Sequence, residues 1–268
     1  QTDHDHRYGR VSEQTASAAT SASTHTPAPP SGRAFAAIGT AVALTPLNST
    51  MIAVALPAMS AGFGSAPSSV TVWVITAYLI ATIVFQMPAG AVADRMGYGP
   101  TLALGRALFL AGAGSATAAP SLWFVIISRL LMAAGGALML PTSMALLRVA
   151  VPAERRPRAF GAMGAVMGTA AALGPALGGL LIARFSWRVL FLVNVPLVLL
   201  SWWLQPKGFG SDARPARPQH RFDVAGSVLL GVALILVVLA TRIPAPLAYV
   251  SGVVGLTLFG ALWVQARR

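Results

Sequence analysis

The sequence predicts an all-α, polytopic helical membrane protein. Of its 268 residues, 56% are hydrophobic and only 10% are charged, whereas soluble domains carry about 25% charged residues. The apolar residues are gathered into runs close to the ~20 residues that a helix needs to span the hydrocarbon layer. Segments of alternating polarity, the pattern of membrane barrels, do not occur in the sequence. We therefore expect a helical bundle in lipid.

Eight apolar runs divide the chain. Residues 1–33 are rich in Ser, Thr, Ala and Pro and predict a disordered cytoplasmic tail. Residues 34–204 then hold six helices, residues 205–222 form a polar cytoplasmic loop, and residues 223–268 add two further transmembrane helices. The chain starts at Gln1 and stops directly after the eighth run, so we expect the complete protein to continue at both ends. The runs are 34–56, 70–93, 101–119, 122–147, 159–183, 187–204, 224–241 and 245–264.

The distribution of basic residues predicts the orientation. Cytoplasmic loops of membrane proteins carry an excess of Lys and Arg. With the N-terminus inside, the inner loops and the C-terminus hold eleven such residues: Arg95, Arg148, Arg155, Arg156, Arg158, Lys207, Arg214, Arg217, Arg221, Arg267 and Arg268. Only Arg184, Arg188 and Arg242 then lie outside. We expect a multi-pass protein of the cell (plasma) membrane with its N-terminus in the cytoplasm.

Several functional classes are disfavoured by composition. The net charge of +12 could indicate nucleic-acid binding, but the basic residues lie in loops without interleaved aromatic residues. The chain has no cysteine, so it offers no disulfide or thiol ligand. His4 and His6 could touch a metal, but a solvated tail accounts for them more simply, and His220 is alone in a loop. The runs hold no paired acids or histidines, so we expect no metal site, no cofactor and no enzyme activity.

Two arginines lie well inside apolar runs, where ionisable side chains are costly and suggest function. Arg106 lies in the third run, and it is either functional or a residue near the membrane surface whose side chain snorkels. Arg129 lies near the start of the fourth run and precedes the small residues 133–137, which allow a neighbouring helix to approach closely. This combination favours a buried arginine with a structural or functional role.

The fifth run is unusually rich in glycine. Positions 164, 168, 175 and 178 share one helical face, and small residues there allow backbone contact with another helix. Pro175 removes a backbone hydrogen bond and kinks the helix. An ordinary packing face accounts for Gly164 and Gly168, but it accounts less well for the block Gly174, Pro175, Gly178 and Gly179.

A short inner turn joins the second and third runs. Residues 90–97 read GAVADRMG, so Gly90 and Gly97 enclose Asp94 and Arg95. An acid at this place can meet a helix N-terminus or an arginine. Alone, this is a weak signal.

Together, these three blocks resemble the signature motifs of the major facilitator superfamily. Its glycine-aspartate-arginine-glycine turn lies between helices 2 and 3, its arginine motif begins helix 4, and its glycine-proline antiporter motif lies in helix 5. Three more stretches resemble the 14-helix drug:proton antiporter (EmrB/QacA-like) family: LNSTMIAVALP at 47–57, where the family has LDxTIVNVALP, WVITAYL at 73–79 and WRVLFLVNVP at 187–196. The seventh and eighth runs match the two helices that this family inserts between its six-helix halves.

The chain departs from the family pattern at several positions. Asn48 replaces the aspartate of helix 1, and Met132 and Ala133 replace the glutamine and first glycine of the arginine motif. The basic residues expected after Gly97 are Tyr98, Gly99 and Pro100. These changes bear on proton coupling and gating more than on the fold.

The resemblance implies a secondary active exporter of drugs or other small organic molecules, driven by the proton gradient. In this superfamily the substrate cavity lies between two halves, so the implied partners are the bilayer, a small substrate and the C-terminal half. Asn48, Gln86 and Arg129 are the candidate cavity residues, and Gly90, Asp94, Arg95 and Gly97 the candidate gating motif. The runs contain no acid, so any proton-carrying acid is expected in the second half. The alternative is a non-transporting truncated protein, or a partner subunit of another transporter.

Overall fold

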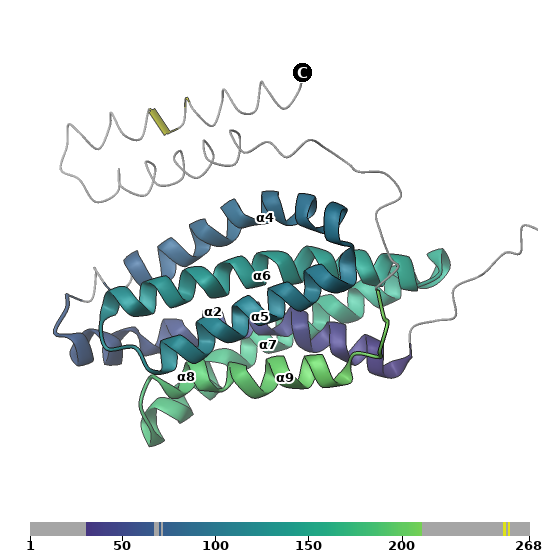
Figure 1. The fold of residues 1–268 in the computed structure, drawn as a ribbon. Coiled ribbons are helices and arrows are strands. Elements are labelled where there is room, and N and C mark those ends of the chain that lie inside the picture. Colours follow the sequence, from purple (N-terminus) through teal and green to yellow (C-terminus); the bar gives the residue numbers. More distant parts are fainter. Residues whose placement is uncertain (1–30, 67–69, 71, 211–253, 256, 258–268) are drawn as a thin grey trace, which may run out of the picture.

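The computed structural model describes residues 31–66, 70, 72–210, 254–255 and 257, and the regular elements among them are all helical (Figure 1). The predicted all-α fold class is confirmed. In chain order the elements are α2 (Gly32–Phe63), η1 (Val72–Thr76), α4 (Ala77–Met96), α5 (Tyr98–Thr117), α6 (Leu122–Ala150), η2 (Ala153–Arg155), α7 (Arg156–Arg184), α8 (Val189–Leu192) and α9 (Asn194–Leu204).

Each of the first six predicted runs corresponds to one helix or one broken helix. Several helices extend beyond their apolar runs; α2, for example, continues to Phe63 although its predicted run ends at residue 56. The segments Gly32–Phe63, Leu122–Ala150 and Ala153–Arg184 have the length and hydropathy of a membrane span, and Trp73–Met96 joins them if its two parts, bent by 45° at Pro88, count as one. Most of the N-terminal tail, the loop beyond Gly210 and nearly all of the seventh and eighth runs lie outside the described residues.

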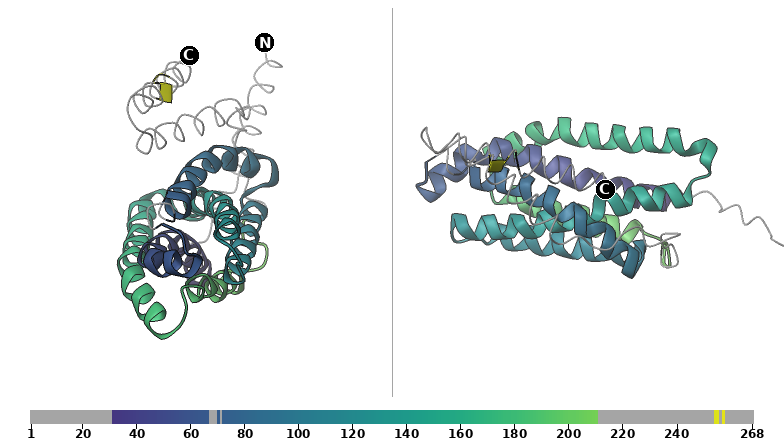
Figure 2. Two further views of the ribbon diagram at one scale, coloured as in Figure 1. Left: turned by 90° about the vertical axis from the view of Figure 1, so that its left-hand side faces the viewer. Right: turned by 90° about the horizontal axis from the view of Figure 1, so that it is seen from above.

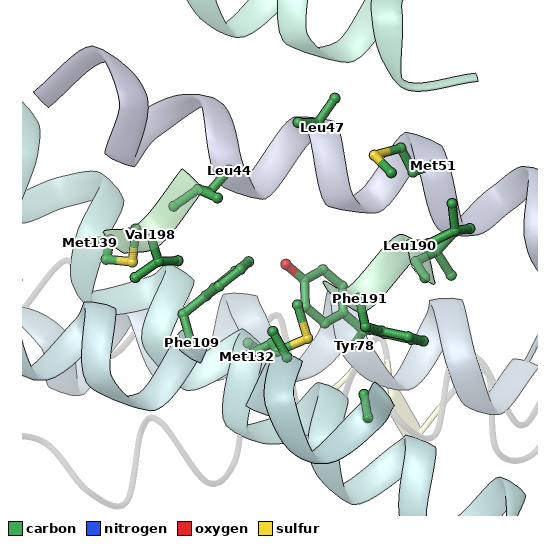
Figure 3. Close-up of a cluster of buried hydrophobic side chains, with 14 of the residues drawn as sticks. Leu44, Leu47, Met51, Tyr78, Phe109, Met132, Met139, Leu190, Phe191 and Val198 are labelled. Carbon is green, nitrogen blue, oxygen red and sulfur yellow. The ribbon is translucent and has the colours of Figure 1, made fainter. Parts of the chain in front are cut away.

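The long helices run side by side, and α2 holds them together. It packs against α7 on one side and against α9 and α6 on the other, while α6 also packs extensively on α5 and α4 (Figure 2). Buried apolar side chains from α2, α5, α6, α8 and α9 meet in the middle of the bundle (Figure 3). Sequence-distant segments therefore share one core.

Glycines allow α5 and α6 to approach closely. A Cβ atom added to Gly135 would lie 2.6 Å from the carbonyl oxygen of Gly105, and one added to Gly112 would lie 2.6 Å from that of Ser128. Such distances leave no room for any side chain. The small residues after Arg129 thus serve the helix contact that the sequence predicts.

Two of the helical segments that correspond to the predicted runs contain irregular turns. The second begins with a π-helical turn, η1, before it continues as α4. The sixth is broken between α8 and α9, with Asn194 at the start of α9 and Pro196 two residues later. Because proline lacks an N–H, the carbonyl four residues before it loses its helical partner. Irregular turns of this kind leave backbone groups that side chains must satisfy.

Candidate functional site

Arg129 of α6 is buried, and its side chain contacts η1 and the start of α4. Its guanidinium lies 4.2 Å from the centroid of the Tyr78 ring, and its Nε donates a hydrogen bond of 2.7 Å to the carbonyl oxygen of Val74 in η1. A π-helical turn shifts the carbonyl directions relative to an α-helix, so Val74 can accept from a side chain. Only 2% of Arg129 is exposed, and its Nη1 has no hydrogen-bond partner among the described residues. The prediction of a buried arginine is confirmed.

The hydroxyl of Tyr78 points into the middle of the apolar cluster, as Figure 3 shows. This oxygen also has no hydrogen-bond partner in the described part of the chain. A Cβ atom added to Gly136 of α6 would lie 3.0 Å from Thr45 Oγ1 and 4.0 Å from the Tyr78 oxygen. The absence of a side chain at Gly136 therefore brings two hydroxyls, from α2 and α4, close to the same point.

Asn48 lies one turn beyond Thr45 on α2 and is fully buried. Its Oδ1 accepts a hydrogen bond of 3.3 Å from Asn194 Nδ2, so it binds α9 rather than Arg129 in this structure. The Asn194 amide also donates to the carbonyl oxygens of Leu190, at 2.9 Å, and Phe191, at 3.4 Å. Asn194 thus satisfies carbonyls beside the α8–α9 break and ties that break to α2.

The three predicted cavity residues therefore lie in different surroundings. Asn48 and Arg129 are buried within the bundle, whereas Gln86 is exposed on α4. Gln86 is not part of the polar cluster formed by the half-buried Thr45 and the buried Asn48, Tyr78, Arg129 and Asn194. That cluster contains two residues, Tyr78 and Asn194, that belong to the family-like stretches at 73–79 and 187–196 but that we did not predict as site residues.

Arg106 is also fully buried, so its side chain does not snorkel to the surface of the described bundle. Its Nη1 donates to Gln205 Oε1 just beyond α9, and its Nε and Nη2 have no hydrogen-bond partner among the described residues. Gln205 Nε2 in turn donates to the Phe209 carbonyl oxygen at 3.2 Å, and Gly99 N–H donates to the Gly210 carbonyl at 3.0 Å. The start of the predicted loop is therefore folded against the ends of α5 and α9.

The predicted turn through residues 90–97 is mostly helical: Gly90, Asp94 and Arg95 of the predicted gating motif lie in the last part of α4, and only Gly97 joins α4 to α5. Gly97 has a φ of 84°, a conformation that side-chain-bearing residues rarely adopt. Its carbonyl accepts a 2.7 Å hydrogen bond from the Thr101 hydroxyl. Burial raises the pKa of the Tyr98 phenol, the nearby Asp94 carboxylate raises it further, and the Arg148 guanidinium lowers it. The turn therefore gathers charges from α4 and α6, while Gly90 and Arg95 are exposed.

The glycines of α7 do not share one packed face. Gly174 lies against the Thr50 side chain of α2, and a Cβ atom on Gly178 would lie 3.1 Å from the Met51 carbonyl oxygen. By contrast, an added Cβ at Gly164, Gly168 or Gly179 would meet no described atom within 4 Å, and Pro175 is exposed. The prediction of a packed face through positions 164 and 168 is wrong for the described bundle, because α2 contacts the adjacent ridge of α7.

Within the described residues no group of three or more His, Cys, Asp or Glu side chains could hold a metal ion. His4, His6 and His220 lie outside those residues.

A solved structure shares this fold. The peptide transporter POT in complex with sulfate matches with a TM-score of 0.61 and 18% sequence identity, over 82% of this chain and 49% of that one. At that identity the likeness shows the fold alone.

Comparison of sequences identifies the family. An uncharacterized MFS-type transporter of Bacillus subtilis, YvkA, is 36% identical over 84% of this chain and 50% of its own length. The tetracenomycin C resistance and export protein of Streptomyces glaucescens is 33% identical over 74% of this chain and 36% of its own. The chain thus spans half or less of the length of these relatives. The pattern of the Major Facilitator Superfamily matches residues 38–266, and the chain belongs to that family of multi-pass membrane transporters.

Proposed function

We propose that this chain supplies the N-terminal part of a secondary active exporter that moves drugs or other small organic molecules in exchange for protons. The family assignment supports transport, and the relative named for tetracenomycin C resistance and export supports the outward direction. The stretches at 47–57, 73–79 and 187–196 support the 14-helix drug:proton antiporter family in particular. The N-terminus faces the cytoplasm in this proposal.

The observation that carries the proposal is the buried polar cluster at mid-length of α2. Transporters of this kind bind substrate near the membrane midplane, at helices whose regular hydrogen bonding is interrupted. Here Arg129 meets the π-helical turn η1, and Asn194 at the α8–α9 break meets Asn48. Polar groups within membrane spans are costly and mark transport pathways.

The proton-carrying group is assigned to a part of the transporter beyond residues 31–210. The acids in that range are Asp94 and Glu154, and both lie at the ends of spans rather than in their middle. Asn48, which replaces the family's aspartate, cannot carry a proton at physiological pH. A titratable carboxylate must therefore come from elsewhere if export is proton-coupled.

An efflux assay tests this function. The complete reading frame that contains this chain is expressed in a bacterium lacking its own drug exporters, and loss of a preloaded fluorescent dye is followed after an energy source is added. We expect faster efflux than in cells with empty vector, and its collapse when nigericin removes the pH gradient. Equal efflux with and without the protein across a panel of anionic, neutral and cationic dyes would instead favour a non-transporting membrane protein.

A further inference from the structure

The orientation of the Asn194 carboxamide is fixed by the backbone around it. Its Nδ2 lies 2.9 Å from the Leu190 carbonyl oxygen and 3.4 Å from that of Phe191. Carbonyl oxygens only accept hydrogen bonds, so the nitrogen of Asn194 must occupy this position. The two ends of an asparagine amide are assigned from just such neighbours.

This orientation determines how Asn48 is placed. Because the same Asn194 nitrogen lies 3.3 Å from Asn48, Asn48 must turn its oxygen toward Asn194. Its own Nδ2 then points away, and it has no hydrogen-bond partner among the described residues. A buried donor without a partner is unfavourable unless another group satisfies it in some state.

Two further buried atoms without a partner in the described bundle, one from α4 and one from α6, are donors as well. Arg129 Nη1 can only donate, and the Tyr78 hydroxyl carries a donor hydrogen; neither has a partner in the described bundle. Asn194 Oδ1 is an unpartnered acceptor in the same cluster of described residues. The donors come from α2, α4 and α6, three spans that meet around Gly136 and Thr45.

We propose that Asn194 acts as a positioning residue that makes Asn48 a hydrogen-bond donor, and that this donor selects substrates bearing carbonyl or phenolate oxygens over organic cations. This inference rests on the proposed export function and names the substrate class of the same site. Asn48 and Asn194 are both fully buried in the structure shown, so substrate reaches the Asn48 amide when the bundle moves against the rest of the transporter.

Two dyes built on the same xanthene provide the test: fluorescein, an anion with oxygen acceptors, and a cationic rhodamine. The complete reading frame is expressed in exporter-deficient cells, and efflux of each dye is measured. We expect the wild type to prefer fluorescein. Asn48→Asp keeps an oxygen for Asn194 but replaces the donor by a second acceptor, so fluorescein efflux should fall roughly tenfold, equivalent to about 1.4 kcal/mol, while rhodamine efflux rises.

Asn194→Ala tests the positioning role. Without its partner the Asn48 amide is free to rotate, so the preference for fluorescein, measured as the ratio of the two dyes' efflux rates, should narrow. Ser201→Ala is the matched control, because Ser201 is equally buried on α9 and also bonds α2, through the Ala37 carbonyl at 2.9 Å. It should leave the preference unchanged.

The outcomes separate the two proposals. If neither the wild type nor any variant exports either dye, the proposed export function is wrong, and the inference that rests on it is wrong as well. If the wild type exports dye but prefers rhodamine, or if Asn48→Asp and Ser201→Ala alter the dye preference equally, export stands and the donor assignment is wrong.

Discussion

Gly174 of α7 lies so close to Thr50 of α2 that even a methyl group at position 174 would overlap the threonine side chain. The Thr50 hydroxyl is held there by hydrogen bonds of 3.0 and 3.1 Å to the Pro46 and Leu47 carbonyls of its own helix. The two backbones can approach only because position 174 carries no side chain.

We expect Gly174→Leu to destabilise the bundle and Gly168→Leu to leave it folded. Overpacking at a close contact costs about 1–3 kcal/mol, whereas position 168 faces no described atom within 4 Å. Thermal unfolding in detergent measures both variants. Similar melting temperatures for the two would contradict the packing of α7 on α2 shown here.

The Gly168→Leu variant also tests whether this face of α7 contacts another part of the complete transporter. If its exposed face contacts other parts of the complete transporter, Gly168→Leu should lower efflux even though the described bundle keeps its stability. Gly164→Leu, on the same open face, should behave in the same way.

The Arg106–Gln205 hydrogen bond predicts that loss of the polar side chain at position 205 destabilises the protein. Gln205→Leu would remove the side-chain oxygen to which the buried Arg106 guanidinium donates, and losing the partner of a buried charged group costs about 1–3 kcal/mol or more. Gln205→Glu should retain a bond and fold. Thermal unfolding of the purified protein checks both; equal stability of Gln205→Leu and wild type would contradict this assignment.

The orientation can be checked on a protein that has no cysteine of its own. Ala61 at the end of α2 and Pro157 at the start of α7 are both exposed. With the N-terminus inside, Ala61→Cys should react in intact cells with a thiol reagent that cannot cross the membrane. Pro157→Cys should react only after the cells are opened, and the reverse pattern would show the opposite orientation.

The helical class and the order of the first six helical segments could be predicted from the sequence, because apolar runs of this length are typical of helices in membrane proteins. A buried Arg129 could be predicted as well, since a charge followed by small residues implies a close helix contact. The hydrogen bond between Asn48 and Asn194, 146 residues apart, could not be predicted, because pairing between distant helices depends on how the bundle assembles.

The packing of the α7 glycines could not be predicted from the sequence either. From spacing alone we predicted that positions 164, 168 and 178 share one packed face. A neighbouring ridge of side chains on the same helix is offset by only one residue, so spacing does not tell the two ridges apart. Which ridge meets α2 depends on the crossing of the two helices. The role of Asn194 had a visible signal: an asparagine two residues before Pro196 can bond carbonyls that a helix break leaves free.

Removal of the Tyr78 hydroxyl should separate function from stability. This oxygen is buried without a partner in the described bundle, so Tyr78→Phe removes an unsatisfied group and should leave the melting temperature unchanged or raise it. The ring that stacks under Arg129 remains. If the hydroxyl contacts substrate, efflux of acceptor-bearing dyes should fall several-fold; unchanged efflux would show that Tyr78 serves only to hold Arg129.

Asp94 provides a last test, of gating against proton transport. It lies near the end of α4 and raises the pKa of the Tyr98 phenol at the start of α5, so it is outside the middle of any span. A residue there can stabilise one state of the transporter through charge contacts between helix ends, and gating rather than proton transport is the role that we propose for Asp94. We therefore expect Asp94→Asn to lower the maximal rate of efflux while the dependence of efflux on pH keeps its midpoint. Asp94→Glu, which keeps the charge, should recover much of the rate. Efflux is measured over a range of external pH in cells or proteoliposomes with the complete protein. If Asp94→Asn abolishes the response to the pH gradient but leaves downhill substrate movement intact, Asp94 carries the proton and the gating role is wrong.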